Sequence, residues 1–179
     1  MYRNLTLVAT AVVCAGMLPA QNQMITENKQ NYETIKTNIM KSAEKMPEEG
    51  YSFQPVKEER TWAELMGHIA DAQTSICSGA AGEPKRGSAA ALKGKTELVK
   101  ALQASFDTCD AIWGATTDEN AKTMTKMRNR DLTRLGMLIY NTTHDNESYG
   151  TMAVYMRLKG VVPPSTADRG APPPAAGKK

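Results

Sequence analysis

Apolar side chains recur along most of the chain with the three- and four-residue spacing of an amphipathic α-helix. Four segments show this period, at about residues 25–46, 61–76, 98–113 and 131–159, and proline or glycine follows each of them. No alternation of apolar and polar residues is long enough to predict a β-sheet, so the helices must bury their apolar faces against one another. The pattern therefore predicts an all-α fold, a four-helix bundle.

Capping residues, glycines and prolines between these segments predict where the helices begin and end. Residues Thr61 to Glu64 form a capping-box sequence, in which the Thr hydroxyl and the Glu carboxylate accept hydrogen bonds from free backbone N–H groups of the first turn. Glycines and Pro84 end this helix, and the stretch up to Lys93 is expected to be a loop. Residues 115–130 are polar and are expected to connect the last two helices.

The first 20 residues have the pattern of a secretory signal peptide. Arg3 precedes an apolar run that ends at a small residue, Ala20. We therefore expect residues 1–20 to be removed on export to the periplasm or the cell exterior, with lipidation at Cys14 as an alternative. No later stretch reaches the roughly 18 apolar residues of a membrane-spanning helix, so no stable membrane insertion is expected after cleavage.

The mature domain is expected to span residues 21–162, followed by a disordered tail. Residues 163–179 are rich in Pro, Ala and Gly and have little to bury. In the whole chain, 22 Lys and Arg against 19 Asp and Glu give a formal charge of +3, too small to predict a nucleic-acid-binding surface. Phosphate-loop, dinucleotide-binding and HExxH motifs do not occur in the sequence.

Two cysteines, Cys77 and Cys109, remain once the leader is removed. An even number of cysteines in an exported chain predicts a disulfide, and the alternative is two buried free thiols. A bridge would close a loop of about 33 residues and stabilise the fold by roughly 3 to 4 kcal/mol in the chain-entropy model. The absence of a CxxC spacing argues against a redox-active or zinc-ribbon role.

The chain has two histidines, His68 and His144. His68 lies at the edge of the apolar face of its helix, and His144 shares a second stripe of the last helix with Met137, Ser148 and Tyr155. Both could face a common interior. A histidine in such a position more often hydrogen-bonds a backbone carbonyl than binds a ligand, so position alone does not assign a function.

Two stretches resemble the DinB superfamily, also called DinB/YfiT-like metalloenzymes. Residues 61–71 read TWAELMGHIAD, and residues 144–164 read HDNESYGTMAVYMRLKGVVPP. The resemblance implies an up-down-down-up four-helix bundle that holds a divalent metal, zinc or nickel, on three histidines. One of these comes from the second helix and two, four residues apart, from the last. Some members are thiol transferases or resemble maleylpyruvate isomerases, and members often form homodimers.

By this resemblance His68 and His144 occupy two metal-ligand positions, and Ser148 stands at the third. A serine hydroxyl is a much weaker zinc ligand than imidazole, so metal binding is expected to be weak or absent. Glu147 and Tyr149 are nearby acid–base candidates, but their helical phase aims neither at the cavity, and no catalytic residue is assigned. A Ser148–His144–Asp145 hydrolase is disfavoured because Asp145 points about 100° away on the helix.

Two functional hypotheses follow. In the first, the chain is an exported DinB-like protein with an incomplete histidine triad and a metal-dependent transferase or hydrolase activity on an unknown small molecule. In the second, it is a structural or small-ligand-binding bundle that has lost its metal centre.

Overall fold

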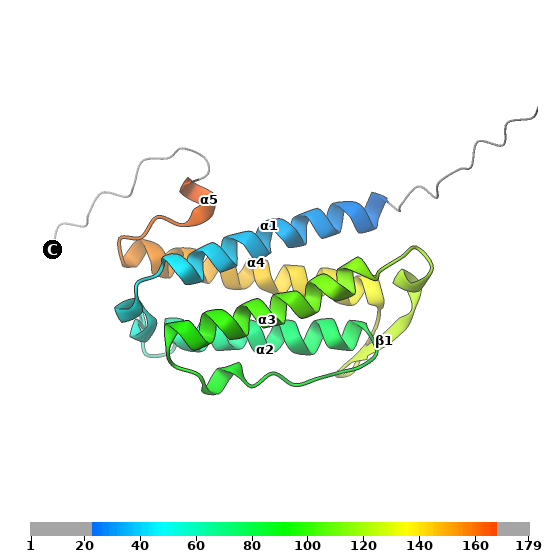
Figure 1. Cartoon of the computed structure of the whole chain (residues 1–179), viewed down its shortest axis with the longest axis horizontal. Coiled ribbons are helices and arrows are strands. Elements are labelled where there is room, and N and C mark those ends of the chain that lie inside the picture. Colours follow the sequence, from blue (N-terminus) through cyan, green and yellow to red (C-terminus); the bar gives the residue numbers. More distant parts are fainter. Residues whose placement is uncertain (1–22, 168–179) are drawn as a thin grey trace, which may run out of the picture.

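The computed structural model describes residues 23–167 and shows a bundle of four long helices (Figure 1). The helices are α1 (Gln23–Lys45), α2 (Trp62–Ala80), α3 (Lys95–Gly114) and α4 (Arg134–Leu158). Helices α2 and α3 run in one direction and α1 and α4 in the other, which is the up-down-down-up order (Figure 1). The all-α bundle predicted from the apolar period is confirmed.

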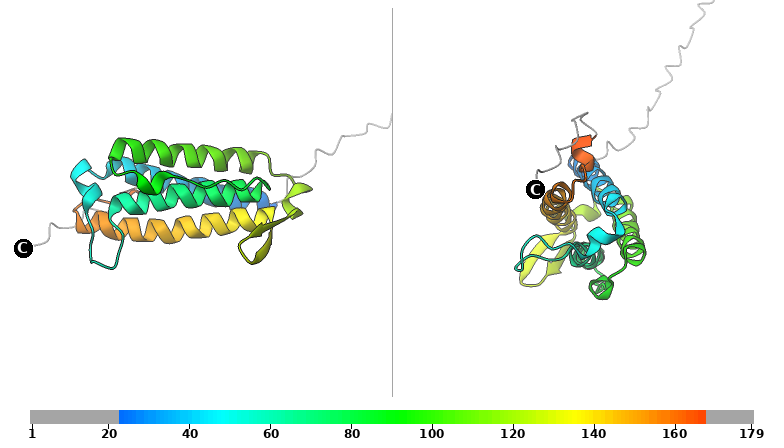
Figure 2. Two further views of the ribbon diagram at one scale, coloured as in Figure 1. Left: turned by 90° about the horizontal axis from the view of Figure 1, so that it is seen from below. Right: turned by 90° about the vertical axis from the view of Figure 1, so that its left-hand side faces the viewer.

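Each helix packs against two neighbours around a common core. Helices α1 and α2 lie at opposite corners, and each contacts both α3 and α4 (Figure 2). Burying one large apolar side chain stabilises the fold by about 1.5–3 kcal/mol. All four helices contribute such side chains, among them Tyr32, Ile39, Trp62, Ile69, Leu98, Phe106, Trp113 and Met137.

Helix α2 begins with the capping box expected from the sequence. The Thr61 hydroxyl accepts a hydrogen bond from the Glu64 backbone N–H at 3.2 Å, and the Glu64 carboxylate accepts one from the Thr61 N–H at 3.0 Å. These bonds fix the first residue of α2 and hence the phase at which the rest of the helix, including His68, faces the bundle.

Because α2 and α3 are parallel, the chain must return along the whole bundle between them. The connection, residues 81–94, contains a short 3-10 helix, η2 (Ala89–Ala91), that packs on α2. The Asp71 carboxylate anchors it by accepting hydrogen bonds from the backbone N–H groups of Ala89, at 2.7 Å, and Ala90, at 3.1 Å. A Cβ atom on Gly67 would lie 2.8 Å from the Ala89 carbonyl oxygen, so the connection can approach α2 only at glycine.

Helices α3 and α4 are joined through a β-hairpin that the sequence analysis did not predict. Strands β1 (Met124–Met127) and β2 (Arg130–Thr133) pair antiparallel, with Met127 opposite Arg130. The expected start of the last helix near Asp131 is therefore wrong. Thr133 is the N-cap, since its hydroxyl accepts a hydrogen bond from the Gly136 N–H at 3.0 Å and α4 begins one residue later.

The ordered domain extends beyond the boundary expected at residue 162. Residues Pro164–Ala167 form a short helix, α5, that contacts α1. The Tyr149 hydroxyl holds it by accepting a hydrogen bond from the Ser165 N–H at 3.0 Å and by lying 2.8 Å from Ser165 Oγ. The expected leader, residues 1–20, and most of the expected tail lie outside the described residues. Within residues 23–167, no helix combines the length and apolarity needed to cross a membrane.

A disulfide joins Cys77 of α2 to Cys109 of α3, with Cα atoms 5.2 Å apart. Both cysteines are fully buried in the core. The bridge cross-links the two parallel helices and, with the connection of residues 81–94, closes a covalent ring.

Replacing Gly67 by Ala is expected to destabilise the fold by about 1–3 kcal/mol, because the new methyl group meets backbone atoms of Ala89 and Ala90 that cannot rotate away. Gly150→Ala is the matched control. It is an exposed position inside α4 with no atom within 4 Å of the added Cβ, so helix propensity should raise stability by up to about 1 kcal/mol. Urea unfolding of both variants provides the comparison, and an equal gain in stability for Gly67→Ala would contradict the close approach.

Candidate functional site

His68 of α2 and His144 of α4 meet between the two helices. Their Nε2 atoms are 3.1 Å apart, and the rings are inclined at 61°. This distance is that of an N–H···N hydrogen bond in which one neutral ring donates and the other accepts. Burial, assisted by the nearby charges of Arg60 and His144, lowers the pKa of His68 below its ordinary value. Burial therefore favours the neutral form of His68.

Behind His144 lies a carboxylate that is wholly buried, that of Asp145. Asp145 Oδ2 accepts hydrogen bonds from Gln73 Nε2 at 3.0 Å and from Asn141 Nδ2 at 3.1 Å. Asn141 Nδ2 also donates to Gln73 Oε1. The three side chains form a polar cluster inside the apolar core, and burial raises the pKa of Asp145 to about 6 while His144 acts in the opposite direction.

The second oxygen of this carboxylate faces His144. Asp145 Oδ1 and His144 Nδ1 are 3.9 Å apart, and both are buried without a hydrogen-bond partner within residues 23–167. The distance is too long for a hydrogen bond, but the negative oxygen favours the tautomer with its proton on Nδ1. Nε2 of His144 is then the acceptor, and His68 is the donor.

Sequence reasoning missed this polar cluster. It set Asp145 aside because adjacent residues lie about 100° apart around a helix, yet Asp145 Oδ1 still comes within 3.9 Å of His144 Nδ1. The usable signal was the pair Asn141 and Asp145. These polar residues lie four apart on a helix face that also carries Leu138 and Tyr149, and such residues are buried only with partners.

Ser148, at the third-ligand position, is buried one turn after His144. It lines a cavity of about 260 Å³ together with both histidines. Glu147 lines the same cavity from an exposed position, whereas the Tyr149 hydroxyl is engaged by Ser165. The structure thus brings the three expected site residues to one cavity and turns Tyr149 away from it.

A second cavity, of about 420 Å³, lies on the other side of the histidines. It is lined by residues of α2, α4 and the β-hairpin and opens to solvent, and both His68 and His144 line it as well. The histidine pair therefore lines two cavities.

The donor set does not fit a tightly bound catalytic metal. Such zinc sites have three protein ligands, and two imidazole nitrogens on one tetrahedral zinc ion lie about 3.3 Å apart, close to the separation of the pair here. The third donor, however, is the Ser148 hydroxyl. Among residues 23–167, no three His, Cys, Asp or Glu side chains are grouped so as to hold an ion.

Replacing Asp145 by Asn is expected to flatten the dependence of the unfolding free energy on pH between about pH 4 and pH 6. The folded state holds the Asp145 proton up to about pH 6, whereas the unfolded chain releases it near pH 4. Stability therefore falls as pH rises through this window, by about 2 to 3 kcal/mol for this one group. Because Asn cannot ionise, the unfolding free energy of the variant should not fall in this way as pH rises.

Urea unfolding at half-unit steps from pH 4 to pH 7 measures the difference between the Asn variant and the wild type. Asp107→Asn, on the exposed face of α3, is the control and should follow the wild type. If the difference in unfolding free energy between the wild type and Asp145→Asn stays constant with pH, the raised pKa of Asp145 is contradicted.

Comparisons with known proteins agree with this fold. The model of the DinB superfamily matches residues 31–152. A crystal structure of a DinB-like protein from Bacillus cereus ATCC 10987 superposes with a TM-score of 0.69 at 19% identity, covering 78% of this chain and 95% of that one. A DinB-like protein from Bacillus subtilis gives 0.58 at 19% identity, covering 78% and 92%. No curated protein matches the sequence. Since the family model covers more than half of the chain, the protein belongs to the DinB superfamily.

Proposed function

We propose that this domain binds a small molecule at the His68–His144 pair and does not hold a resident divalent metal ion. The observation that carries the proposal is the 3.1 Å contact between the two Nε2 atoms, with a serine at the third position. Each imidazole satisfies the other, so neither nitrogen needs an ion. The pair still presents polar edges to two cavities, and the larger, at about 420 Å³, has the size of small-molecule sites.

The residues around the pair support binding more than catalysis. Within the described chain, Ser148 forms no hydrogen bond to either histidine, so it is not activated as a nucleophile. The Tyr149 and Tyr155 hydroxyls are engaged, with Ser165 and with the Arg60 carbonyl respectively. What remains for a ligand is His68 Nδ1, which in this tautomer accepts a hydrogen bond.

The second candidate is weak binding of zinc or nickel, with a metal-dependent transferase or hydrolase activity. It is favoured by the convergence of the two Nε2 atoms and by the Asp145 carboxylate behind His144. Metal-ligating histidines usually have such a carboxylate behind them. The two candidates differ in whether the wild-type protein keeps its ion.

Replacing Ser148 by His is expected to convert weak zinc binding into tight binding, because it supplies the missing third imidazole one helical turn from His144. The gain in affinity should be at least about 100-fold. It is measured by competition with a fluorescent zinc chelator and by elemental analysis of untagged protein. Thr143→His, which adds an exposed histidine on the same helix, is the matched control and should give no gain.

His144→Ala in the Ser148→His background should abolish the gained site. Near-stoichiometric zinc or nickel in the wild type that His144→Ala removes would overturn the proposal in favour of the second candidate. No gain in Ser148→His would show that the three positions do not converge on one ion.

We also propose that the domain acts outside the cytoplasm, with residues 1–20 removed. The charged start and apolar run of the leader and the Cys77–Cys109 bridge support this. Intact mass of the full-length chain expressed with its own leader should correspond to a product beginning at residue 21. In urea-unfolded protein, neither cysteine should react with iodoacetamide until a reductant is added. A retained leader, or alkylation without reductant, would contradict export.

A further inference from the structure

The larger cavity differs from the smaller one in the residues that the β-hairpin adds to it. We propose that Arg128, at the turn of the hairpin, binds the anionic group of a small organic acid that occupies this cavity. The inference rests on the proposed function, since it names the class of molecule that the histidine-pair pocket takes.

The walls of the cavity suit a ligand that has both an apolar part and polar groups. Side chains of α2, α4 and the hairpin form its apolar lining, namely Ala72, Ile76, Met127 and Met137. The histidine pair, Tyr140 and Ser75 add polar side chains to the same lining, beside the charged Asp71, Lys126 and Arg128. Cavities of this size that combine apolar walls with a few polar groups are typical of small-molecule sites.

The charged groups of this cavity favour an anion. Lys126 and Arg128 line it from the hairpin, and Asp71 is the one carboxylate in its lining. Both oxygens of Asp71 already accept backbone hydrogen bonds from η2. These N–H groups partly neutralise the carboxylate, so it repels an anion in the cavity less strongly. Lys126 lies 3.9 Å from Asp131, whereas Arg128 forms no ion pair with any carboxylate among residues 23–167.

The smaller cavity has the opposite bias. Glu59 and Glu147 line it, with Arg60 as the single cation. An anion is therefore repelled on that side of the histidine pair and attracted on the hairpin side. This difference assigns the anionic ligand to the larger cavity.

The backbone at Arg128 gives an independent argument. Arg128 is the first residue of the two-residue turn between β1 and β2, and its φ is +54°. Glycine is the residue that such a turn position favours, and any other side chain there is strained. Residues kept in strained conformations cluster at binding sites. Here the strained residue is the one that brings a guanidinium to the cavity.

The hairpin is held in position by contacts that do not involve Arg128. The Arg130 guanidinium lies 5.6 Å from the centre of the Tyr140 ring on α4, and the Thr125 hydroxyl donates to the Leu132 carbonyl at 3.1 Å. These contacts hold the turn next to the cavity without using the Arg128 side chain. Arginine binds a carboxylate through two parallel N–H···O bonds, which suits an organic acid better than a neutral ligand.

The experiment follows backbone amide shifts of ¹⁵N-labelled protein, residues 21–179, titrated with benzoate, benzyl alcohol or inorganic phosphate. Benzoate should perturb amides of residues 125–128 and of α2 near His68, and benzyl alcohol and phosphate should bind at least about tenfold more weakly. Arg128→Gly should lower the affinity for benzoate by a similar factor, and Arg128→Lys should lower it by less.

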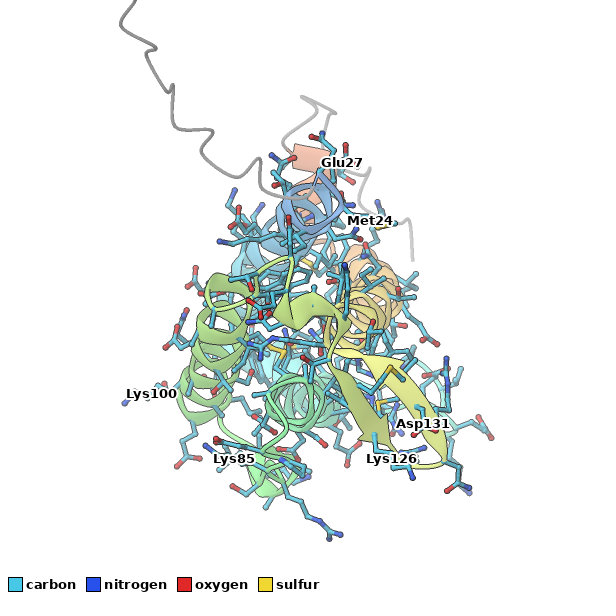
Figure 3. All side chains as sticks on the ribbon, turned by 90° about the vertical axis from the view of Figure 1, so that its right-hand side faces the viewer. Met24, Glu27, Lys85, Lys100, Lys126 and Asp131 are labelled. Carbon is cyan, nitrogen blue, oxygen red and sulfur yellow. A yellow bond between two sulfur atoms is a disulfide. The ribbon has the colours of Figure 1, made fainter. Side chains whose placement is uncertain are left out.

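Arg128→Gly separates binding from folding, because glycine relieves the strained turn. Its unfolding midpoint in urea should equal or exceed that of the wild type while benzoate binding is lost. Lys100→Ala is the charge-matched control, since Lys100 lies on α3, well away from the hairpin that carries Lys126 (Figure 3).

The proposal is overturned if benzoate does not bind, if Arg128→Gly binds it as well as the wild type, or if benzyl alcohol binds equally. If phosphate binds as tightly as benzoate, the site recognises anions in general, and the proposal that the ligand is an organic acid is wrong. Each titration is run with EDTA and again with one equivalent of zinc. Tight zinc in the wild type would refute the metal-free function, while the dependence of benzoate binding on Arg128 tests the anion site separately.

Discussion

A single buried carboxylate constrains the centre of this bundle. Asp145 has no exposed surface, and a carboxylate in an apolar core is costly unless it accepts hydrogen bonds. Gln73 from α2 and Asn141 from α4 both donate to its Oδ2, so the bond from Gln73 favours the register in which α2 packs on α4. That register also determines where His68 and His144 lie. The contact between the histidines is thus a consequence of the polar cluster behind them.

The same cluster reaches the third helix. Gln73 Oε1 lies 2.8 Å from Cys109 Sγ, next to the bridge to Cys77. One amide side chain therefore touches both the carboxylate of α4 and the disulfide of α3. Loss of the bridge would loosen the packing around Gln73, and through it the orientation of Asp145 and His144.

Much of the fold could be predicted from the sequence, because helices with one apolar face leave a periodic signal. The capping box at Thr61 and the helix end at Gly160, with its φ of +71°, were readable for the same local reason. The hairpin was not. Its strands have four residues each, too few for alternation to stand out, and Leu132 fits the apolar face of a helix as well as it fits β2.

The candidate site, like the fold, could be predicted from the sequence only in part. Helical phase placed His68 at the edge of an apolar face and His144 in a second stripe of the last helix, and the family resemblance supplied their metal-ligand roles. That their rings touch depends on how α2 packs on α4, which no local pattern encodes. Asp145 was missed because a polar residue in a helix is normally solvated, and its burial follows only from partners on another element.

The ring closed by the disulfide has a consequence for how the chain is held together. Residues 82–86 of the returning connection are exposed and lie between Cys77 and Cys109. A protease cut there would leave two fragments still joined by a covalent bond and by the packing of α2 against α3. The bundle can therefore be nicked at this place without coming apart, and new chain termini could be opened there in a circularly permuted version.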